Sequence, residues 1–222
     1  MRNAVPDPRL EDAVAVRVAR RGLAAREEAY ADEVRRLLDA AFSVMRASGD
    51  LDPRVSDIVR ESGLSNQAFY RHFSGKDELL LAVLEDGQRQ LVDYLERRMR
   101  DVPPGLPQVR RWIEGVLEQA RNRDAAERTR PFAVNGTRLR DRFPTEAGRA
   151  TELLLGPLRE AVAESGGDPE RDAAAVYQLA IGTMYEHLLE RTEPSRDDVD
   201  HLVRFALGGI RAATKDERGD AA

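Results

Sequence analysis

The chain has 222 residues, no cysteine and a formal net charge of −5 at pH 7. Without cysteine it has neither a disulfide framework nor a zinc–thiolate site. It also shows no apolar leader and no run of about 18 apolar residues that would cross a membrane. We therefore expect a cytoplasmic protein with no cofactor, no bound metal and no membrane partner. The negative net charge argues mildly against binding to nucleic acid, although binding depends on the local electrostatic field rather than on the net charge.

Residues 1–25 carry five arginines and two prolines without a clear apolar face. This composition predicts a flexible basic arm whose last part can be helical. Arg17, Arg20 and Arg21 are candidates for reaching a DNA minor groove, as basic arms do. The alternative is a tail without defined structure.

Residues 27–48 predict an amphipathic helix that Gly49 can end. Its apolar face holds Val34, Leu37, Leu38, Ala41, Phe42 and Met45. We expect this helix to pack on the segment that follows and to complete a three-helix DNA-binding domain over residues 26–74.

Residues 52–84 have the pattern of two short helices joined by a tight turn, followed by the start of a third helix. Asp52, followed by a proline, suits a helix start. Gly63 suits a turn with positive φ, and Ser65 can cap the second helix. Two short helices joined by a Gly-containing turn have helix-turn-helix geometry, here at about residues 53–73.

The second short helix carries a polar surface that a buried helix would not need. In a helix-turn-helix motif its N-terminal residues face the major groove, and Asn and Gln amides can discriminate for adenine by about 1–3 kcal/mol. The candidate DNA contacts are Arg54, Ser65, Asn66, Gln67, Tyr70, Arg71, His72 and Lys76. Tyr70, His72 and Lys76 suit phosphates, and the start of a helix at Lys76 would add to the attraction for an anion.

This segment resembles the DNA-binding domain of the tetracycline-repressor (TetR) family of bacterial regulators. The resemblance rests on Val55, Asp57, Ile58, the Gly63-Leu64-Ser65 turn, Phe69-Tyr70, His72-Phe73, and Lys76 with Glu78-Leu79-Leu80. Arg54 and Val59 depart from the pattern, because a threonine and an alanine are common there. A solvated helical hairpin is the alternative, but it leaves the polar surface of the second helix unexplained. Beyond about residue 95 no residue-level resemblance is visible, which is usual for the variable ligand domain of this family.

Ser74, with Asp77 three residues later, predicts a capping box for a long connecting helix over residues 75–102. A Pro-Pro-Gly sequence then marks a linker at residues 103–105.

Only helical patterns follow the linker, so the predicted fold class is all-α. A larger helical ligand-binding and dimerisation domain is expected over residues 103–216, with a tail at 217–222. Its predicted segments are 107–122, short helices within 124–142 interrupted at Pro131 and Asn135-Gly136, 144–165 kinked at Pro157, 169–191 started by Asp168, and a last helix opened by Ser195 with Asp198.

The last two long helices are apolar over a wide arc, and such an arc must be buried. One side can face its own domain, and the rest most simply faces a second copy across a two-fold axis. The family resemblance implies the same homodimer; a monomer with a large core is the alternative. A dimer would read two half-sites about one helical turn apart, so the operator should be an inverted repeat.

The resemblance also implies a small-molecule effector inside the C-terminal domain. The candidate lining residues are Trp112, Phe132, Tyr177, Met184, Tyr185 and His187. Each can equally be a packing residue. Pro157 and the irregular segment at 131–144 can loosen the packing and leave a cavity, for which we expect an apolar or amphipathic ligand.

The sequence is interpreted as a dimeric DNA-binding transcriptional regulator, a repressor that a small ligand releases from its operator. The alternatives are a helical scaffold that binds only proteins, and a helical enzyme that uses His187 or His201 in acid–base chemistry. Neither histidine is accompanied by a nucleophile motif, a phosphate loop or paired metal ligands. No catalytic residue and no metal ligand is therefore predicted.

Overall fold

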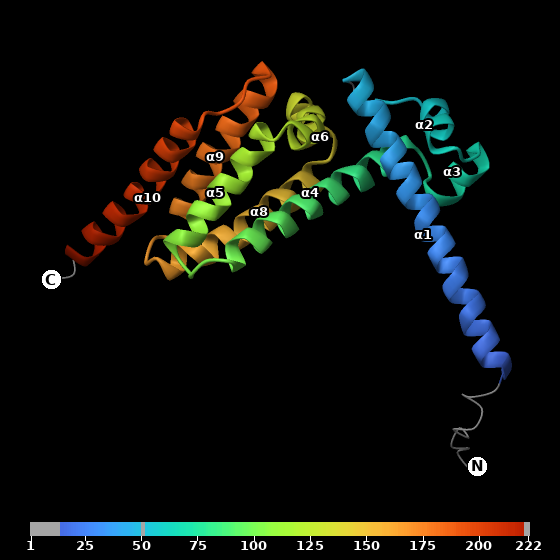
Figure 1. Cartoon of the computed structure of the whole chain (residues 1–222), viewed down its shortest axis with the longest axis horizontal. Coiled ribbons are helices and arrows are strands. Elements are labelled where there is room, and N and C mark those ends of the chain that lie inside the picture. Colours follow the sequence, from blue (N-terminus) through green and yellow to red (C-terminus); the bar gives the residue numbers. More distant parts are fainter. Residues whose placement is uncertain (1–13, 50–51, 220–222) are drawn as a thin grey trace, which may run out of the picture. The chain divides into compact units, whose positions relative to one another are not determined.

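The computed structural model describes residues 14–49 and 52–219, which form ten α-helices and no strand (Figure 1). This confirms the all-α fold class. Within the described residues no helix is both long enough and apolar enough to span a membrane. The chain divides into two compact units. One holds the residues up to 44 together with 53–79, and the other holds 45–52 and the residues from 80 onward.

The first unit contains the helix-turn-helix motif. Helix α1 spans Val14–Ser48, α2 spans Val55–Ser62 and α3 spans Asn66–His72. The buried apolar residues of this unit are Leu37, Ala40, Ala41, Ile58, Ala68, Phe69, Phe73 and Leu79. The Arg36 guanidinium also donates from Nη2 to the carbonyl oxygen of Ser62 at 2.6 Å, which ties α1 to the end of α2.

Helix α1 ends where the sequence predicts but begins much earlier. Gly49 follows it with φ of 70°, as expected for a left-handed helix end. Residues 14–25, the last part of the predicted arm, are helical and continue α1, as the sequence allowed. Extending an existing helix adds one hydrogen bond per residue without a new nucleation step, and this stretch is rich in alanine. Residues 1–13 of the predicted arm lie outside the described residues.

The turn between α2 and α3 has the predicted glycine conformation and serine cap, but the start of α2 differs from the prediction. Gly63 has φ of 66°, and Ser65 Oγ accepts a hydrogen bond from the Ala68 N–H at 3.1 Å. The predicted cap by Asp52 is wrong, because Arg54 is the N-cap residue and makes no side-chain cap bond. Arg54 is extended, with φ of −77° and ψ of 139°, so α2 begins at Val55.

The remaining helices are α4 (Lys76–Arg100), α5 (Leu106–Arg121), α6 (Arg123–Val134), α7 (Gly136–Arg142), α8 (Pro144–Glu164), α9 (Arg171–Glu190) and α10 (Arg196–Gly219). In the second unit α5 is central and packs against α6, α8, α9 and α10. Its residues Trp112, Ile113 and Val116 have no exposed surface. The Trp112 indole N–H donates to the carbonyl oxygen of Leu154 at 3.2 Å, so the one polar atom of that side chain is satisfied.

The predicted helix boundaries hold at most places but fail at Pro131. Helix α6 contains Pro131, so the expected interruption there is wrong. Helix α8 contains Pro157 within it, as predicted. The break at Asn135 is confirmed, and its side-chain amide donates to the Pro131 carbonyl oxygen at 2.9 Å.

Three carboxylates cap helix starts. Asp198 accepts from the backbone N–H and the hydroxyl of Ser195, as predicted. Asp168 accepts from two backbone N–H groups at the start of α9. The predicted pair of Ser74 with Asp77 is corrected, because Glu78 accepts from the Ser74 backbone and hydroxyl instead.

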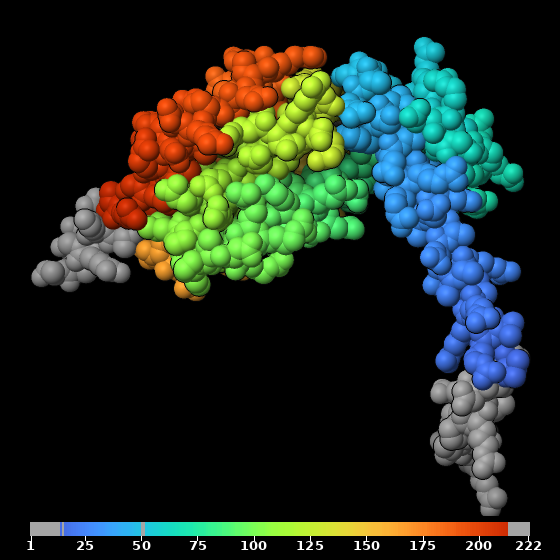
Figure 2. All heavy atoms as spheres, in the orientation of Figure 1, coloured from blue at the N-terminus to red at the C-terminus, as the bar shows by residue number. Residues whose placement is uncertain are grey.

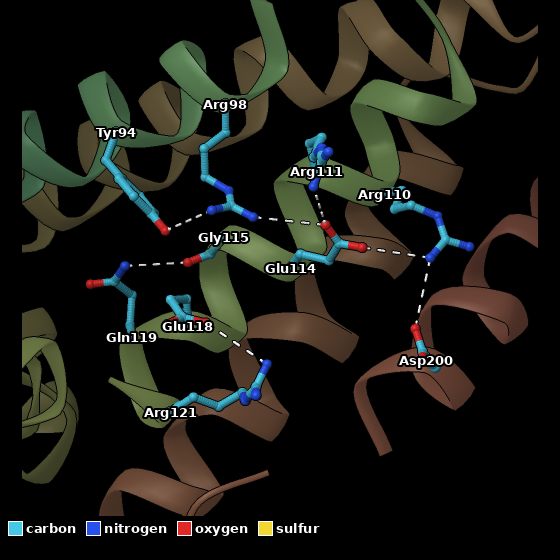
Figure 3. Close-up of polar contacts among 10 residues, drawn as sticks. All are labelled: Tyr94, Arg98, Arg110, Arg111, Glu114, Gly115, Glu118, Gln119, Arg121 and Asp200. Atoms are coloured by element: carbon cyan, nitrogen blue, oxygen red, sulfur yellow. Dashed lines mark hydrogen bonds and ion pairs between the residues drawn. The ribbon is translucent and has the colours of Figure 1, made fainter. Parts of the chain in front are cut away.

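Helices α4 and α5 approach closely at Gly115. A Cβ atom there would lie 2.6 Å from Leu95 Cδ2, and Leu95 is itself buried. The next residue toward the N-terminus, Glu114, binds Arg98 of α4 at 3.8 Å and Arg111 at 3.1 Å (Figure 3). Arg110 joins the same carboxylate to Asp200 of α10 (Figure 3). Charged contacts therefore border this packing on one side.

We predict that Gly115→Val destabilises the protein, because overpacking a closed contact costs about 1–3 kcal/mol. Gly148→Ala is the control: a Cβ there meets nothing within 4 Å, and alanine gains up to about 1 kcal/mol over glycine in a helix. Urea unfolding measures both free energies. If both variants changed the free energy of unfolding equally and in the same direction, the α4–α5 contact would have room for the added side chain.

Candidate nucleic-acid interface

The orientation of α3 about its own axis is set by its buried residues. Phe69 has no exposed surface, and Ala68 is also buried. Asn66, Gln67 and Tyr70 are exposed on the other side, with Tyr70 exposed to 61%. The polar groups predicted to face bases and phosphates therefore lie together on the free side of the helix.

Two other candidates lie at the starts of neighbouring helices. Arg54 is exposed at the N-cap position of α2, and Lys76 is the first residue of α4. Lys76 shares its helix start with Glu78, whose carboxylate already occupies the Ser74 N–H. These hydrogen bonds from the Ser74 hydroxyl and N–H lower the pKa of Glu78. An incoming phosphate must therefore compete with that carboxylate.

His72 is corrected from an exposed phosphate contact to a buried structural contact. Its side chain has no exposed surface, and its Nε2 lies 2.6 Å from Glu33 Oε2 of α1. The Tyr30 ring, also from α1, meets the imidazole edge-on at a centroid distance of 4.2 Å. Arg71 pairs with the same Glu33 oxygen but keeps about half of its side chain exposed.

Glu33 is a residue that the sequence gives no reason to select. It lies 39 positions before His72, so no local spacing relates the two. Hydrogen bonds from His72 and then Arg71 hold its pKa below the usual range for a glutamate, against the opposing effect of burial. Its carboxylate joins α1 to the C-terminal end of the recognition helix.

Comparison with known proteins agrees with this geometry. Residues 37–83 match the model for bacterial regulatory proteins of the tetR family. The HTH-type transcriptional regulator SrpR of Pseudomonas putida is 26% identical over 206 residues, which cover 87% of this chain and 91% of that protein. Residues 37–83 thus match the TetR-family DNA-binding segment, and the chain as a whole is similar to a regulator of the HTH type. It is a DNA-binding transcriptional regulator, and the reading as an enzyme through His187 or His201 is not supported.

Solved structures share the fold of this chain. A TetR-family regulator from Streptomyces coelicolor has a TM-score of 0.62 at 22% identity and covers 84% of this chain and 96% of its own. The regulator FadR from Bacillus subtilis, solved in complex with stearoyl-CoA, has a TM-score of 0.60 at 16% identity. It covers 79% of this chain and 96% of its own.

The second unit has a cavity of about 420 Å³ between α4, α5 and α8. Val92, Met99, Leu153 and Pro157 supply apolar walls, and three glutamates with Arg100 supply polar ones. Pro157 thus lies beside a cavity, as the sequence suggested.

None of the six predicted ligand residues lines this cavity. Trp112 and Met184 belong to the buried core, and Tyr177 packs against Trp112 at 6.1 Å between ring centroids. Tyr185 packs against the same core, and burial raises the pKa of its phenol. His187 Nδ1 contacts the Thr192 hydroxyl at 2.7 Å, and Phe132 lies near Gly87 of α4. In this conformation these residues serve packing.

We predict that Glu33→Gln lowers the stability of the DNA-binding unit at neutral pH. A carboxylate with a lowered pKa stabilises the fold above its ordinary pKa, and that stability is lost as the pH falls through the folded value. The stability difference between wild type and variant should therefore shrink in acid. Thermal unfolding across a pH series measures it.

Asp32→Asn is the matched control on the same helix, because Asp32 pairs only with the exposed Arg35 and exposed pairs contribute little. A pH-independent difference for Glu33→Gln would contradict the assigned role of the Glu33 carboxylate.

Proposed function

We propose that this chain is a homodimeric repressor in the cytoplasm that binds an inverted-repeat operator and leaves it when a small apolar or amphipathic effector binds. The main support for the proposal is the exposed polar side of α3, which lies opposite the buried Phe69 side chain. Asn66 and Gln67 lie at the N-terminal end of that helix and are exposed. That is the end that enters the major groove in helix-turn-helix proteins.

We further propose that some of these side chains contact bases and that others contact phosphates. Gln67 and Asn66 carry amides that can bond base edges in a bidentate manner. Tyr70, Arg54 and Lys76 carry groups that suit phosphate oxygens, which fix position on the duplex without reading sequence. Ser65 Oγ accepts the helix-cap hydrogen bond, so its hydroxyl hydrogen and one lone pair remain for a contact with DNA.

Support for the dimer comes from α9 and α10. Phe205 is exposed to 69%, and Gly208 and Gly209 follow it at spacings that place them on the same side of α10. A Cβ atom at Gly182 of α9, Gly208 or Gly209 would meet nothing within 4 Å in the single chain. A large exposed aromatic beside small residues suits the close approach of a second copy related by a two-fold axis.

Support for effector release comes from α4. This helix begins in the first unit and continues through the second, and its residues Val92, Met99 and Arg100 line the cavity. A ligand shifts the equilibrium only if it prefers one of two arrangements. A coupling of about 1–3 kcal/mol would change operator affinity about 5–150-fold. The complex of FadR with stearoyl-CoA shows that an amphipathic molecule binds one protein of this fold.

We predict different losses for Gln67→Ala and Lys76→Ala. Operator sequences are first selected by the wild-type protein from a random duplex library. Gln67→Ala should relax preference at one base pair in each half-site, at a cost of about 1–3 kcal/mol. Lys76→Ala should weaken binding to all sequences and reduce the salt slope by about one. Uniform loss of affinity in both variants would contradict the division into base and phosphate contacts.

We predict that Phe205→Asp converts the dimer to a monomer, because a carboxylate cannot be buried unpaired at the contact. Light scattering measures the mass, and circular dichroism checks that helix content is kept. Val134→Asp is the control, since Val134 of α6 is also exposed, to 53%. A Phe205→Asp protein that stays dimeric would place the dimer contact elsewhere.

A further inference from the structure

The N-terminal part of α1 projects from the DNA-binding unit as a helix with no packing partner. We call residues 14–29 the arm helix. Every residue from 17 to 29 is exposed, and the exposed apolar side chains include Val14, Val18 and Leu23. Figure 2 shows this segment standing clear of the atoms of α2 and α3. Its surface is therefore available to a partner.

The arm helix has a formal net charge of +2, from four arginines against Glu27 and Glu28 at its C-terminal end, whereas the formal charges of the motif beside it cancel. Residues 14–26 contain four arginines and no acidic residue. Arg17, Arg20 and Arg21 are spaced as i, i+3 and i+4, so they share one side of the helix. Among the described residues none of the three forms an ion pair. Like charges at this spacing destabilise a helix by repulsion, and an anionic partner would relieve it.

The motif itself offers little net attraction for phosphates. Residues 53–79 contain four basic and four acidic side chains, and their formal charges cancel. Arg60 is paired with Asp57 at 2.9 Å, and Arg71 is paired with Glu33. The uncompensated positive charge of the first unit is therefore concentrated on the arm helix.

The point where the arm helix leaves the unit is defined by contacts with α3. Tyr30 and Glu33, just after the arm helix, contact His72 at the C-terminal end of the recognition helix. When the N-terminal end of α3 lies in the major groove, its other end lies toward the groove edge, where the phosphates are. The arm helix therefore starts beside the DNA backbone.

Groove dimensions decide how such a helix can bind. An α-helix with its side chains is about 10–12 Å wide, whereas the minor groove is about 6 Å wide. The arm helix as a whole therefore cannot lie within the minor groove. The neighbouring major groove is occupied by α3. The remaining surface is the phosphate backbone itself.

We propose that the arm helix is a second DNA contact, which binds backbone phosphates beside each half-site through Arg17, Arg20 and Arg21 and reads no bases. The inference rests on the proposed DNA-binding function and adds to it. The specific contacts of α3 and the salt-dependent attraction of the arm helix are then carried by different elements of one unit.

The test compares two charge-matched triple variants of the full chain. One is Arg17→Gln/Arg20→Gln/Arg21→Gln. The control is Arg123→Gln/Arg149→Gln/Arg171→Gln, which removes three exposed arginines from the second unit. Binding to a fluorescent duplex of random sequence is measured between about 50 and 200 mM salt. Each lost phosphate contact lowers the salt slope by about 0.9.

A dimer carries six of these arginines, so the arm variant should lose about five units of slope. Over that salt range the wild-type affinity would then fall about 1,800-fold more than the affinity of the arm variant. The control should keep the wild-type slope. The ratio of selected-operator to random-duplex affinity should be unchanged in the arm variant, because phosphate contacts carry no sequence information. A wild-type slope in the arm variant overturns the inference.

Gly22 tests whether the arm acts as a helix. A Cβ atom there meets nothing within 4 Å, so Gly22→Ala is sterically free and favours the helix, whereas Gly22→Pro breaks it. Gly22→Ala should bind the random duplex at least as tightly as wild type, and Gly22→Pro should bind more weakly with a reduced slope. Wild-type binding by Gly22→Pro would show that the helical conformation is not used, and would overturn the proposal.

Other outcomes separate this inference from the function on which it rests. If the wild-type protein selects no operator, the proposed function fails. If it selects one and the arm variant retains the full salt slope, only the inference about the arm helix fails. Anionic vesicles of phosphatidylserine test a membrane surface as the partner of the basic and apolar side chains. Arginine-dependent vesicle binding with unaltered DNA binding would overturn the assignment to DNA.

Discussion

Phe69 is fully buried, and its burial determines which side chains form the exposed polar side of α3. Residues of a helix follow one another at about 100° around the axis, so burying Ala68 and Phe69 turns Asn66, Gln67 and Tyr70 outward. Rotating α3 to bury the amides instead would leave polar groups without water or partners, at a cost of a few kcal/mol each. Hydrophobic packing, rather than any contact with DNA, therefore determines which side chains are offered to a groove.

The ends of α3 are held by polar contacts of two kinds. At its start, the positive φ of Gly63 and the cap by Ser65 set where the helix begins. At its end, Glu33 of α1 holds Arg71 and His72. This second contact removes one imidazole from the DNA-facing surface and partly neutralises one arginine. The polar surface of α3 is thereby held firmly in place but carries little net charge.

The second unit is organised around α5, which packs against α6, α8, α9 and α10. Gly115 allows α4 and α5 to approach so closely that a single Cβ would collide with Leu95. Glu114 adds charged contacts with Arg98 of α4 and, through Arg110, with Asp200 of α10. Closely packed interiors tend to switch between discrete arrangements rather than deform continuously. A cavity beside α4 is therefore well placed to act on the helix that both units share.

The sequence by itself determined the fold class, the helix-turn-helix, the order of the helices and most of their ends. These features depend on local chemistry: apolar spacing along a helix, the positive φ at Gly63, and caps such as Ser65 and Ser195. Predictions from local sequence were wrong where a different nearby side chain made the contact or where a helix continued past the expected break. Glu78 replaced Asp77 as the partner of Ser74, and Pro131 did not interrupt α6.

Only the tertiary structure decided the contacts between distant segments. The Glu33–His72 contact joins residues 39 positions apart, so no spacing in the sequence predicts that His72 is buried. The same holds for the cavity, whose walls come from three helices and include none of the aromatic residues that looked suited to a ligand. Helical periodicity shows that a side is apolar, but which neighbour covers it is determined by packing in three dimensions.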